Sequence, residues 1–75
     1  MTTEVTTKVP GNIWKVLVKE GDQVKKGDTL FIMEVMKTEV YHDSPIDGNI
    51  AKINIKNDQE NVDPGTVAIV IEQIN

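Results

Sequence analysis

The chain uses one short motif twice, and this internal repeat restricts its fold more than any other feature. Residues 11–19 have the sequence GNIWKVLVK and residues 48–56 have GNIAKINIK, so that the glycine, the asparagine, the isoleucine and both lysines coincide. After one inserted residue the correspondence resumes at Val24 with Val62. A motif repeated at this spacing predicts one unit assembled from two similar halves.

Alternation within each copy favours β-strands. In the first copy the apolar residues Trp14, Val16 and Val18 occupy alternate positions. Lys15 and Lys19 occupy odd-numbered positions, which belong to the opposite face of a strand. Side chains at alternate positions of a strand share one face of the sheet. We therefore expect the apolar set, Trp14 included, to face the core and the lysines to face solvent. Glycine and proline interrupt every such run, and no helix signal remains.

These strands predict an all-β fold. We expect a flattened β-barrel, or barrel-sandwich hybrid, of two four-stranded antiparallel sheets packed face to face and related by a pseudo-two-fold axis. A chain of 75 residues buries about 60% of the surface of its unfolded form, which permits one modest core. The expected organisation is a single small domain, residues 1–75, with repeat halves of about 9–36 and 45–73.

Composition excludes several classes of function. The formal net charge is −4 and the chain contains no arginine, which argues against nucleic-acid binding and allows docking to a basic partner surface. Without cysteine there is neither a disulfide nor a thiolate metal site. No apolar run approaches the roughly 20 residues of a membrane span, and the start of the chain lacks the features of a signal peptide. We expect a cytosolic protein without membrane insertion.

A lysine stands where the chain is expected to reverse direction. Residues 29–33 and 38–42 have the pattern of two strands, and Met36 and Lys37 are left for the turn between them. Two-residue hairpin turns favour Asn-Gly or Asp-Gly, because their residues adopt positive φ angles. A Met-Lys turn breaks this preference between two regular strands, which indicates a functional site with Lys37 at its tip.

The sequence around this turn resembles a known family. Residues 34–37, Glu-Val-Met-Lys, are similar to the Glu-Ala-Met-Lys-Met signature of biotinyl domains, the carriers of biotin-dependent carboxylases and decarboxylases. Residues 21–27 resemble the Gly-Asp-x-Val-x-x-Gly loop of that family, and residues 45–48 resemble its Pro-x-x-Gly loop. Val35 replaces the usual alanine, and Thr38 replaces the usual second methionine.

The resemblance implies a non-catalytic carrier with biotin attached covalently to Lys37. A biotin-protein ligase would attach the biotin, and the domain would carry a carboxyl group from a biotin carboxylase to a carboxyltransferase or decarboxylase. Met36 would pack into an apolar pocket of the ligase or, alternatively, fill a gap between the sheets. The other residues that we expect the ligase to recognise are Glu34, Val35, Thr38 and Glu39.

Two alternative functions remain open at this point. Lipoyl domains share the fold but typically carry an acidic residue and then Asp or Ser before the lysine, so that Met36 favours biotin over lipoate. The second alternative is an interaction module that is never modified. The acetyl-CoA, propionyl-CoA, pyruvate and oxaloacetate systems use similar carriers, so the parent enzyme also stays open.

Other polar clusters are weaker candidates. His42, Asp43 and Ser44 are adjacent and cannot converge as a hydrolytic triad requires, so we expect a surface histidine. The acidic residues of the loop at 58–63 lack the spacing and the glycine of a calcium loop. We expect them to be solvated turn residues.

Overall fold

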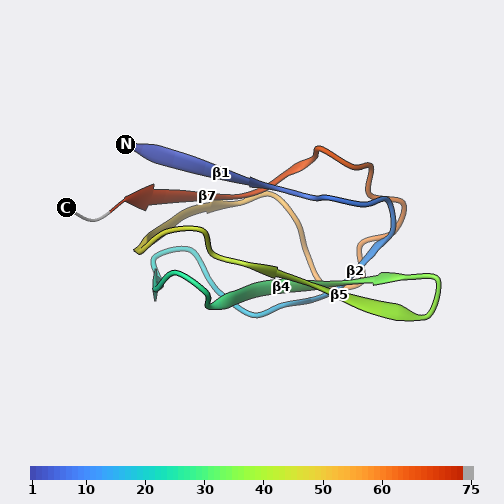
Figure 1. The fold of residues 1–75 in the computed structure, drawn as a ribbon. Coiled ribbons are helices and arrows are strands. Elements are labelled where there is room, and N and C mark those ends of the chain that lie inside the picture. The colour runs from blue at the N-terminus through green and yellow to red at the C-terminus, as the bar shows by residue number, and fades with distance from the viewer. Residues whose placement is uncertain (74–75) are drawn as a thin grey trace.

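The computed structural model describes residues 1–73, which form seven β-strands and no helix. The strands, labelled in part in Figure 1, are β1 (Thr2–Thr6), β2 (Asn12–Val16), β3 (Gln23–Val24), β4 (Thr29–Val35), β5 (Thr38–Asp43), β6 (Gly48–Ile53) and β7 (Val67–Gln73). The described part of the chain thus offers no helix long and apolar enough to cross a membrane.

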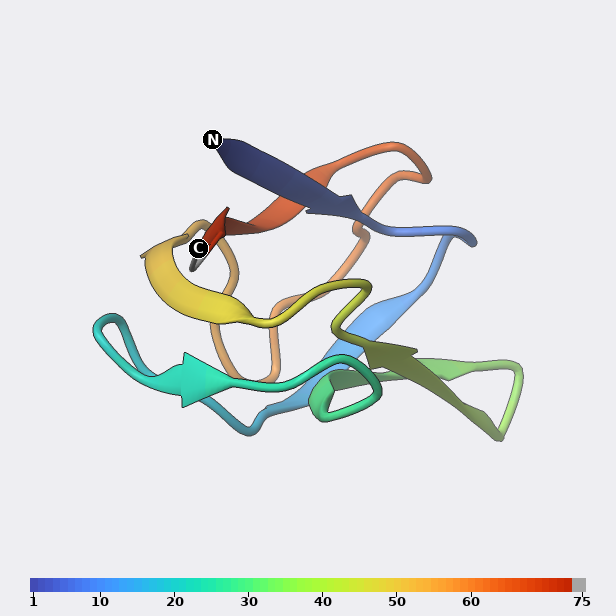
Figure 2. The same ribbon diagram turned by 60° about the vertical axis from the view of Figure 1, so that its left-hand side comes forward.

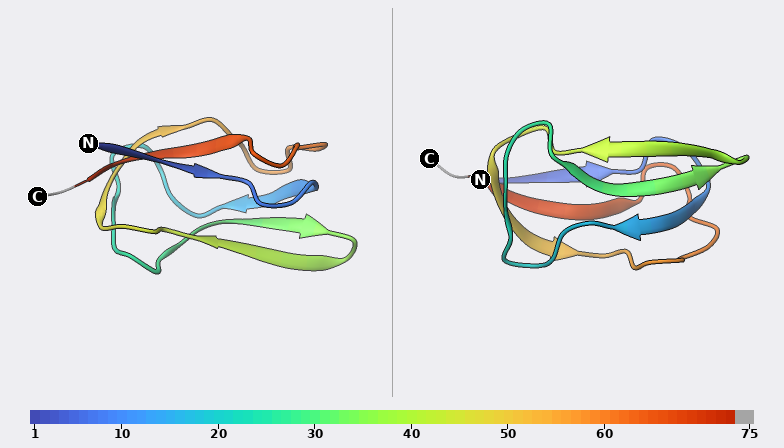
Figure 3. Two further views of the ribbon diagram at one scale, coloured as in Figure 1. Left: turned by 45° about the horizontal axis from the view of Figure 1, so that its top comes forward. Right: turned by 90° about the horizontal axis from the view of Figure 1, so that it is seen from below.

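The strands form two antiparallel sheets, one with the order β1-β7-β6-β3 and the other with the order β2-β4-β5. The sheets lie face to face, as Figures 1 and 3 show. The body is elongated, with principal-axis extents of 38 × 17 × 17 Å. The structure confirms the expected all-β architecture of two packed antiparallel sheets.

A pseudo-two-fold relationship links the two sheets, because equivalent strands pair in equivalent registers. Phe31 lies opposite His42 in the β4–β5 pair, and Ile69 lies opposite Val5 in the β7–β1 pair. The β4–β5 pair is closed by a tight hairpin, whereas the corresponding end of the β7–β1 pair holds the start of β1 and the end of β7. The hairpin therefore lies at the opposite end of the molecule from the start of β1 (Figure 1).

One expected strand is reduced to a single residue, which corrects the prediction of two four-stranded sheets. In the first half Gln23 and Val24 pair with β6, whereas in the second half only Val62 pairs, as an isolated bridge with Gly11. Asn61, just before the bridge, has a φ of 57°. A residue in this left-handed region turns the chain out of the extended conformation. The second sheet consequently has three strands and one bridge.

A β-bulge at the same position of each repeat makes the predicted orientation of Trp14 wrong. The register of β2 against β4 shifts between Ile13 and Lys15, and the register of β6 against β7 shifts after Ile50. Each bulge adds one residue that has no partner, Trp14 or Ala51. The isoleucines before the bulges face the core, while Trp14 and Ala51 are exposed.

Buried apolar side chains from both halves of the repeat form one core. Full burial of a Val, Leu, Ile, Phe or Met side chain stabilises a fold by roughly 1.5–3 kcal/mol relative to leaving that side chain in water. The core residues are Val5, Ile13, Val24, Leu30, Phe31, Met33, Ile50, Ile55, Val62, Ala68, Ile69 and Ile71.

His42 is also buried, and the expectation of a surface histidine is wrong. Its side chain is 1% exposed, and its ring stacks on Phe31 with the ring centroids 4.4 Å apart. His42 Nε2 accepts a hydrogen bond of 3.3 Å from the backbone N–H of Lys8. Alternation along β5 gives the signal for this burial, because His42 shares a face with the apolar Val40, which packs against the core.

Candidate functional site

The turn between β4 and β5 consists of Met36 and Lys37, as the sequence predicts. Val35 and Thr38 form the last pair of the ladder before it. The φ angles of Met36 and Lys37 are 48° and 68°, as in the type I′ turn of a two-residue hairpin. Residues with a Cβ enter this left-handed region at a cost of about 1–2 kcal/mol each. The demands of the fold alone therefore do not account for a Met-Lys pair.

Both side chains of the turn project into solvent. Met36 is 93% exposed, and Lys37 is exposed as well. The hairpin reaches beyond the neighbouring loops at its end of the molecule (Figures 2 and 3). This exposure excludes the alternative in which Met36 fills a gap between the sheets. An apolar thioether and a primary amine are instead presented together to a partner.

The ladder brings the other four predicted recognition residues together at the base of the hairpin. Glu34 lies opposite Glu39, and Val35 lies opposite Thr38. Glu34, Thr38 and Glu39 are exposed, whereas Val35 is partly buried. The geometry allows one partner surface to contact all four, and their recognition by a ligase stays a prediction.

Gly11 permits a close approach between β2 and the base of the hairpin. A Cβ at this position would lie 2.8 Å both from the Glu34 carbonyl oxygen and from Val35 Cγ2. Gly48 meets the carbonyl oxygen of Glu72 in the same way in the other half. Glycine is required at the start of each motif because a neighbouring backbone occupies the space of a side chain.

Tyr41 connects the hairpin carboxylates to the outer face of the β2-β4-β5 sheet. Its hydroxyl donates a hydrogen bond of 3.0 Å to Glu39 Oε1. This hydrogen bond, together with the negative charge of Glu39, raises the pKa of the Tyr41 hydroxyl above its usual value. The hydrogen bond from the tyrosine orients one of the two carboxylates at the base of the hairpin.

A pocket of about 160 Å³ lies beside the base of the hairpin and was not predicted from the sequence. It is lined by Asn12, Ile13, Trp14, Glu34, Asp58 and Glu60. The unequal repeat offers a signal for it, since Trp14 stands where the second copy has Ala51. The acidic loop that was expected only to be solvated thus also forms one wall of this pocket.

The remaining candidates have structural roles. The Asp43 carboxylate accepts a hydrogen bond of 2.9 Å from the Thr29 hydroxyl, and the Ser44 hydroxyl donates one of 2.6 Å to the Ile46 carbonyl. His42 points into the core, so these residues do not converge as a triad. Within residues 1–73 no three His, Asp or Glu side chains are placed to hold a metal ion.

The comparison with known proteins agrees with the hairpin geometry. A family model described as "Biotin-requiring enzyme" matches residues 1–71. The chain is 37% identical over 67 residues to the methylcrotonoyl-CoA carboxylase subunit alpha, mitochondrial, of Dictyostelium discoideum. It is 44% identical over 62 residues to the dihydrolipoyllysine-residue acetyltransferase component of the pyruvate dehydrogenase complex of Mycoplasma capricolum.

A solved structure has the same fold. The crystal structure of the urea carboxylase of Kluyveromyces lactis matches with a TM-score of 0.87 at 32% sequence identity. The three matches cover 89%, 83% and 96% of this chain, but only 10%, 14% and 6% of the three longer proteins. Since the family model spans nearly the whole chain, the chain belongs to the biotin–lipoyl attachment family.

Proposed function

We propose that this chain is a biotin carboxyl carrier domain and that biotin is attached to Lys37. The observation that carries the proposal is the exposed Met36-Lys37 turn, held at positive φ between two paired strands. Membership of a family described as biotin-requiring supports it, as does the similarity to a methylcrotonoyl-CoA carboxylase subunit. In the proposed function the chain acts as a non-catalytic carrier.

The hairpin suits covalent attachment through an amide. An exposed lysine amine is protonated in neutral water and is a poor nucleophile, so the modifying ligase must activate it. The protonated Lys37 amine first loses one proton to the ligase or solvent and then attacks the acyl carbon of a biotinyl-adenylate. The nitrogen loses a second proton, the bond from that carbon to the phosphate oxygen breaks, AMP leaves with the electron pair, and the amide forms. Lys37 loses its positive charge in this step.

The chain contributes position rather than bond-making groups. Biotin, when bound, supplies a ureido nitrogen that can carry a carboxyl group. Strands β4 and β5 hold Lys37 clear of the core, which gives the attached group a wide range of approach and a high effective concentration at partner sites. The proposed partners are a biotin-protein ligase, a biotin carboxylase and a carboxyltransferase or decarboxylase, in the cytosol.

A lipoyl carrier is the second candidate, and one observation favours it. The similarity to the Mycoplasma capricolum acetyltransferase component covers 83% of the chain at 44% identity. The residue before the lysine favours biotin, because Met36 offers an exposed thioether in place of the acidic or hydroxyl side chain typical of lipoyl hairpins. An unmodified interaction module is the third candidate.

Intact mass and peptide mapping separate the three candidates. The purified chain is incubated with ATP, biotin and a biotin-protein ligase, and in parallel with lipoate and a lipoate ligase. We expect one biotin per chain, located on Lys37. The Lys37→Arg variant should take up no biotin. The control variant Lys52→Arg alters an exposed lysine beside the bulge of β6 and should be labelled like the wild type. Labelling at another lysine, or by lipoate alone, would contradict the proposal.

A further inference from the structure

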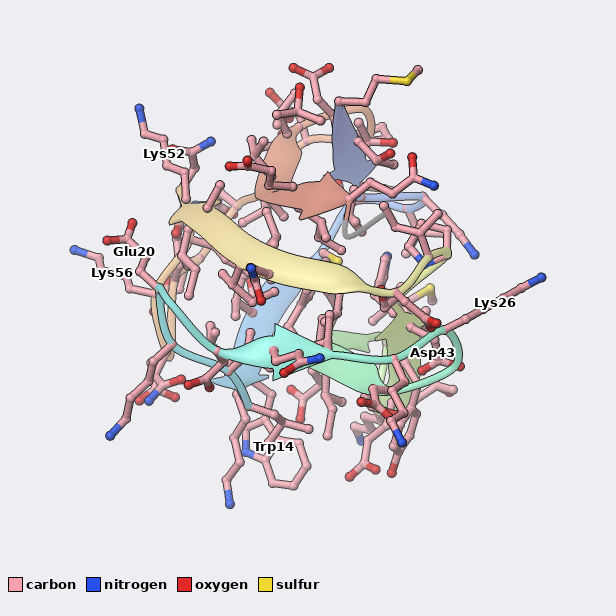
Figure 4. The ribbon with its side chains drawn as sticks, turned by 90° about the vertical axis from the view of Figure 1, so that its left-hand side faces the viewer. Trp14, Glu20, Lys26, Asp43, Lys52 and Lys56 are labelled. Atoms are coloured by element: carbon pink, nitrogen blue, oxygen red, sulfur yellow. The ribbon has the colours of Figure 1, made fainter. Side chains whose placement is uncertain are left out.

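The outer face of the β2-β4-β5 sheet carries an aromatic patch that the attachment chemistry does not use. Ile32 lies opposite Lys15 in one ladder and opposite Tyr41 in the other. Lys15 Nζ lies 5.1 Å from the centroid of the Trp14 ring. Trp14 and Tyr41 are 39% and 54% exposed, and Figure 4 shows Trp14 pointing away from the sheets. Ile32 between them is only 7% exposed, so the surface that a partner can contact comes from its three neighbours. We call Trp14, Lys15, Ile32 and Tyr41 the outer patch.

The two-fold-related face of the other sheet lacks such a patch. The registers of β6 and β1 against β7 place at the equivalent positions Ala51, Lys52, Val70 and Glu4. The same fold is thus built there with alanine in place of tryptophan and glutamate in place of tyrosine. Ile32 is buried on this face, whereas the equivalent Val70 is only partly buried, so the larger side chains around Ile32 cover more of their sheet. Two of the three aromatic residues of the chain, Trp14 and Tyr41, nevertheless remain exposed on the sheet that carries the hairpin.

Carboxylates border the outer patch on the side of the hairpin. Glu34 and Glu39 form the next outward-facing pair toward the tip, and Glu39 accepts the hydrogen bond from Tyr41. The pocket beside Trp14 adds Asp58 and Glu60. An aromatic surface with an acidic border is complementary to a protein surface that has an apolar centre and basic side chains around it.

We propose that the outer patch is a docking surface for the biotin-protein ligase, which presents an apolar, basic-rimmed surface to it. This inference rests on the proposed function. It assigns Trp14 and Tyr41 to partner recognition, beyond the residues of the turn itself. The patch is continuous with the turn because Ile32 and Tyr41 lie on β4 and β5, the two strands that hold Lys37, and β2 with Trp14 and Lys15 pairs with β4.

The distance from Lys37 at which each partner acts favours the ligase over the enzymes that use the attached biotin. The ligase must bring its acyl-adenylate to the Lys37 amine itself, so its surface meets the hairpin directly. A carboxylase site receives a ring at the end of the lysine side chain and the biotin side chain, and can act without touching the sheet. Tyr41 is four residues from Lys37, or about 13 Å along an extended strand. A standard interface, about 800 Å² on each partner and so roughly 30 Å across, includes both.

The test uses kinetics on the whole chain with a purified ligase. Trp14→Ala and Tyr41→Thr, alone and together, are compared with Ala51→Ser and Glu4→Thr, which alter the equivalent positions of the other sheet. We expect the double variant to raise the KM of the chain for biotinylation about tenfold with kcat nearly unchanged, because aromatic anchors dominate binding at interfaces. The two control variants should behave like the wild type.

A second measurement needs no amino-acid substitution in the outer patch, only a fluorine label on Trp14. Trp14 is the single tryptophan of the chain, so 5-fluorotryptophan gives one ¹⁹F resonance. In the Lys37→Arg chain, which binds without reacting, this resonance should shift when the ligase is added. An unshifted resonance, or an unchanged KM in the double variant, would overturn the inference. If the wild-type chain is not biotinylated at all, the proposed function fails instead. A shift of the ¹⁹F resonance produced by a carboxylase subunit but not by the ligase would also overturn the inference about the outer patch.

Discussion

Glu34 and Glu39 lie directly opposite each other in the β4–β5 ladder, so that two carboxylates face each other at the base of the lysine hairpin. Like charges in this position destabilise a pair of strands. The equivalent Glu72 lies opposite the uncharged Thr2, so the fold does not call for a charged pair. The arrangement is suited to attracting basic side chains of a partner.

Neutralising one member of this pair should stabilise the protein. Glu34→Gln should raise the free energy of unfolding by roughly 0.2–1 kcal/mol, because it removes the repulsion from Glu39. Thermal unfolding at low salt measures the gain, which should shrink at about 1 M salt as the charges are screened. Glu72→Gln is the matched control and should bring no such gain. A loss of stability in Glu34→Gln would show that the carboxylate has a favourable partner.

Glycine at the tip should improve the fold and abolish the carrier. Lys37 has a φ of 68°, which glycine adopts without the steric penalty of a Cβ. We expect Lys37→Gly to raise the free energy of unfolding by about 0.5–1 kcal/mol, while no biotin is attached. Lys37→Arg keeps the Cβ and should leave stability within about 0.5 kcal/mol of the wild type. Denaturant unfolding of the three proteins decides the point, and equal stability of Lys37→Gly and the wild type would contradict it.

The internal repeat and the residues of the turn were the main basis for predicting the all-β fold and the exposed hairpin tip from the sequence. Alternation identified strands β2, β4, β5 and β6, though not β1, and the unusual Met-Lys pair located the exposed tip, because both follow from local backbone rules. The orientation of Trp14 could not be obtained in this way. A bulge shifts the alternation by one residue, and it arises from pairing with a distant strand, which local periodicity does not describe.

Two further features depend on tertiary contacts. The polarity of His42 predicts a surface position, yet this residue takes the position that Val5 holds in the other half and stacks on Phe31. The pocket beside Trp14 joins β2 to the loop after β6, segments that are far apart in the sequence. The motif around Lys37 predicts the chemistry of attachment, whereas the surface that selects a partner becomes visible only in the folded chain.

Acidification below neutral pH should destabilise the protein through His42. Burial lowers the pKa of this imidazole from its usual 6.5 and outweighs the raising effect of the Val40 backbone. The charge of Lys8, which lowers the pKa, and that of Asp43, which raises it, have smaller effects. As the pH falls below about 6.5, the unfolded chain therefore takes up a proton that the folded chain does not. Protonation would also break the bond that Nε2 accepts from the Lys8 backbone N–H.

The stability contributed by neutral His42 is thus complete above the unfolded pKa and is lost as the pH falls toward the lower folded pKa. One proton allows a slope of at most about 1.4 kcal/mol per pH unit. Denaturant unfolding between pH 7.5 and 5.5 measures it, with His42→Val as the control that copies Val5. If wild type and His42→Val show the same pH dependence, another group is responsible.

The residue before the lysine should decide which cofactor is attached. Met36 is 93% exposed, so a biotin ligase that recognises it must enclose the thioether in an apolar pocket. Met36→Asp would place a carboxylate in that apolar pocket without a partner. This burial would cost binding on the order of a few kcal/mol. Biotinylation should fall at least tenfold, and lipoylation should rise.

Thr38→Met, which restores the usual second methionine, should leave biotinylation equal or faster. Initial rates with the two ligases measure both variants, and unchanged biotinylation of Met36→Asp would mean that the ligase recognises the geometry of the hairpin and not this side chain.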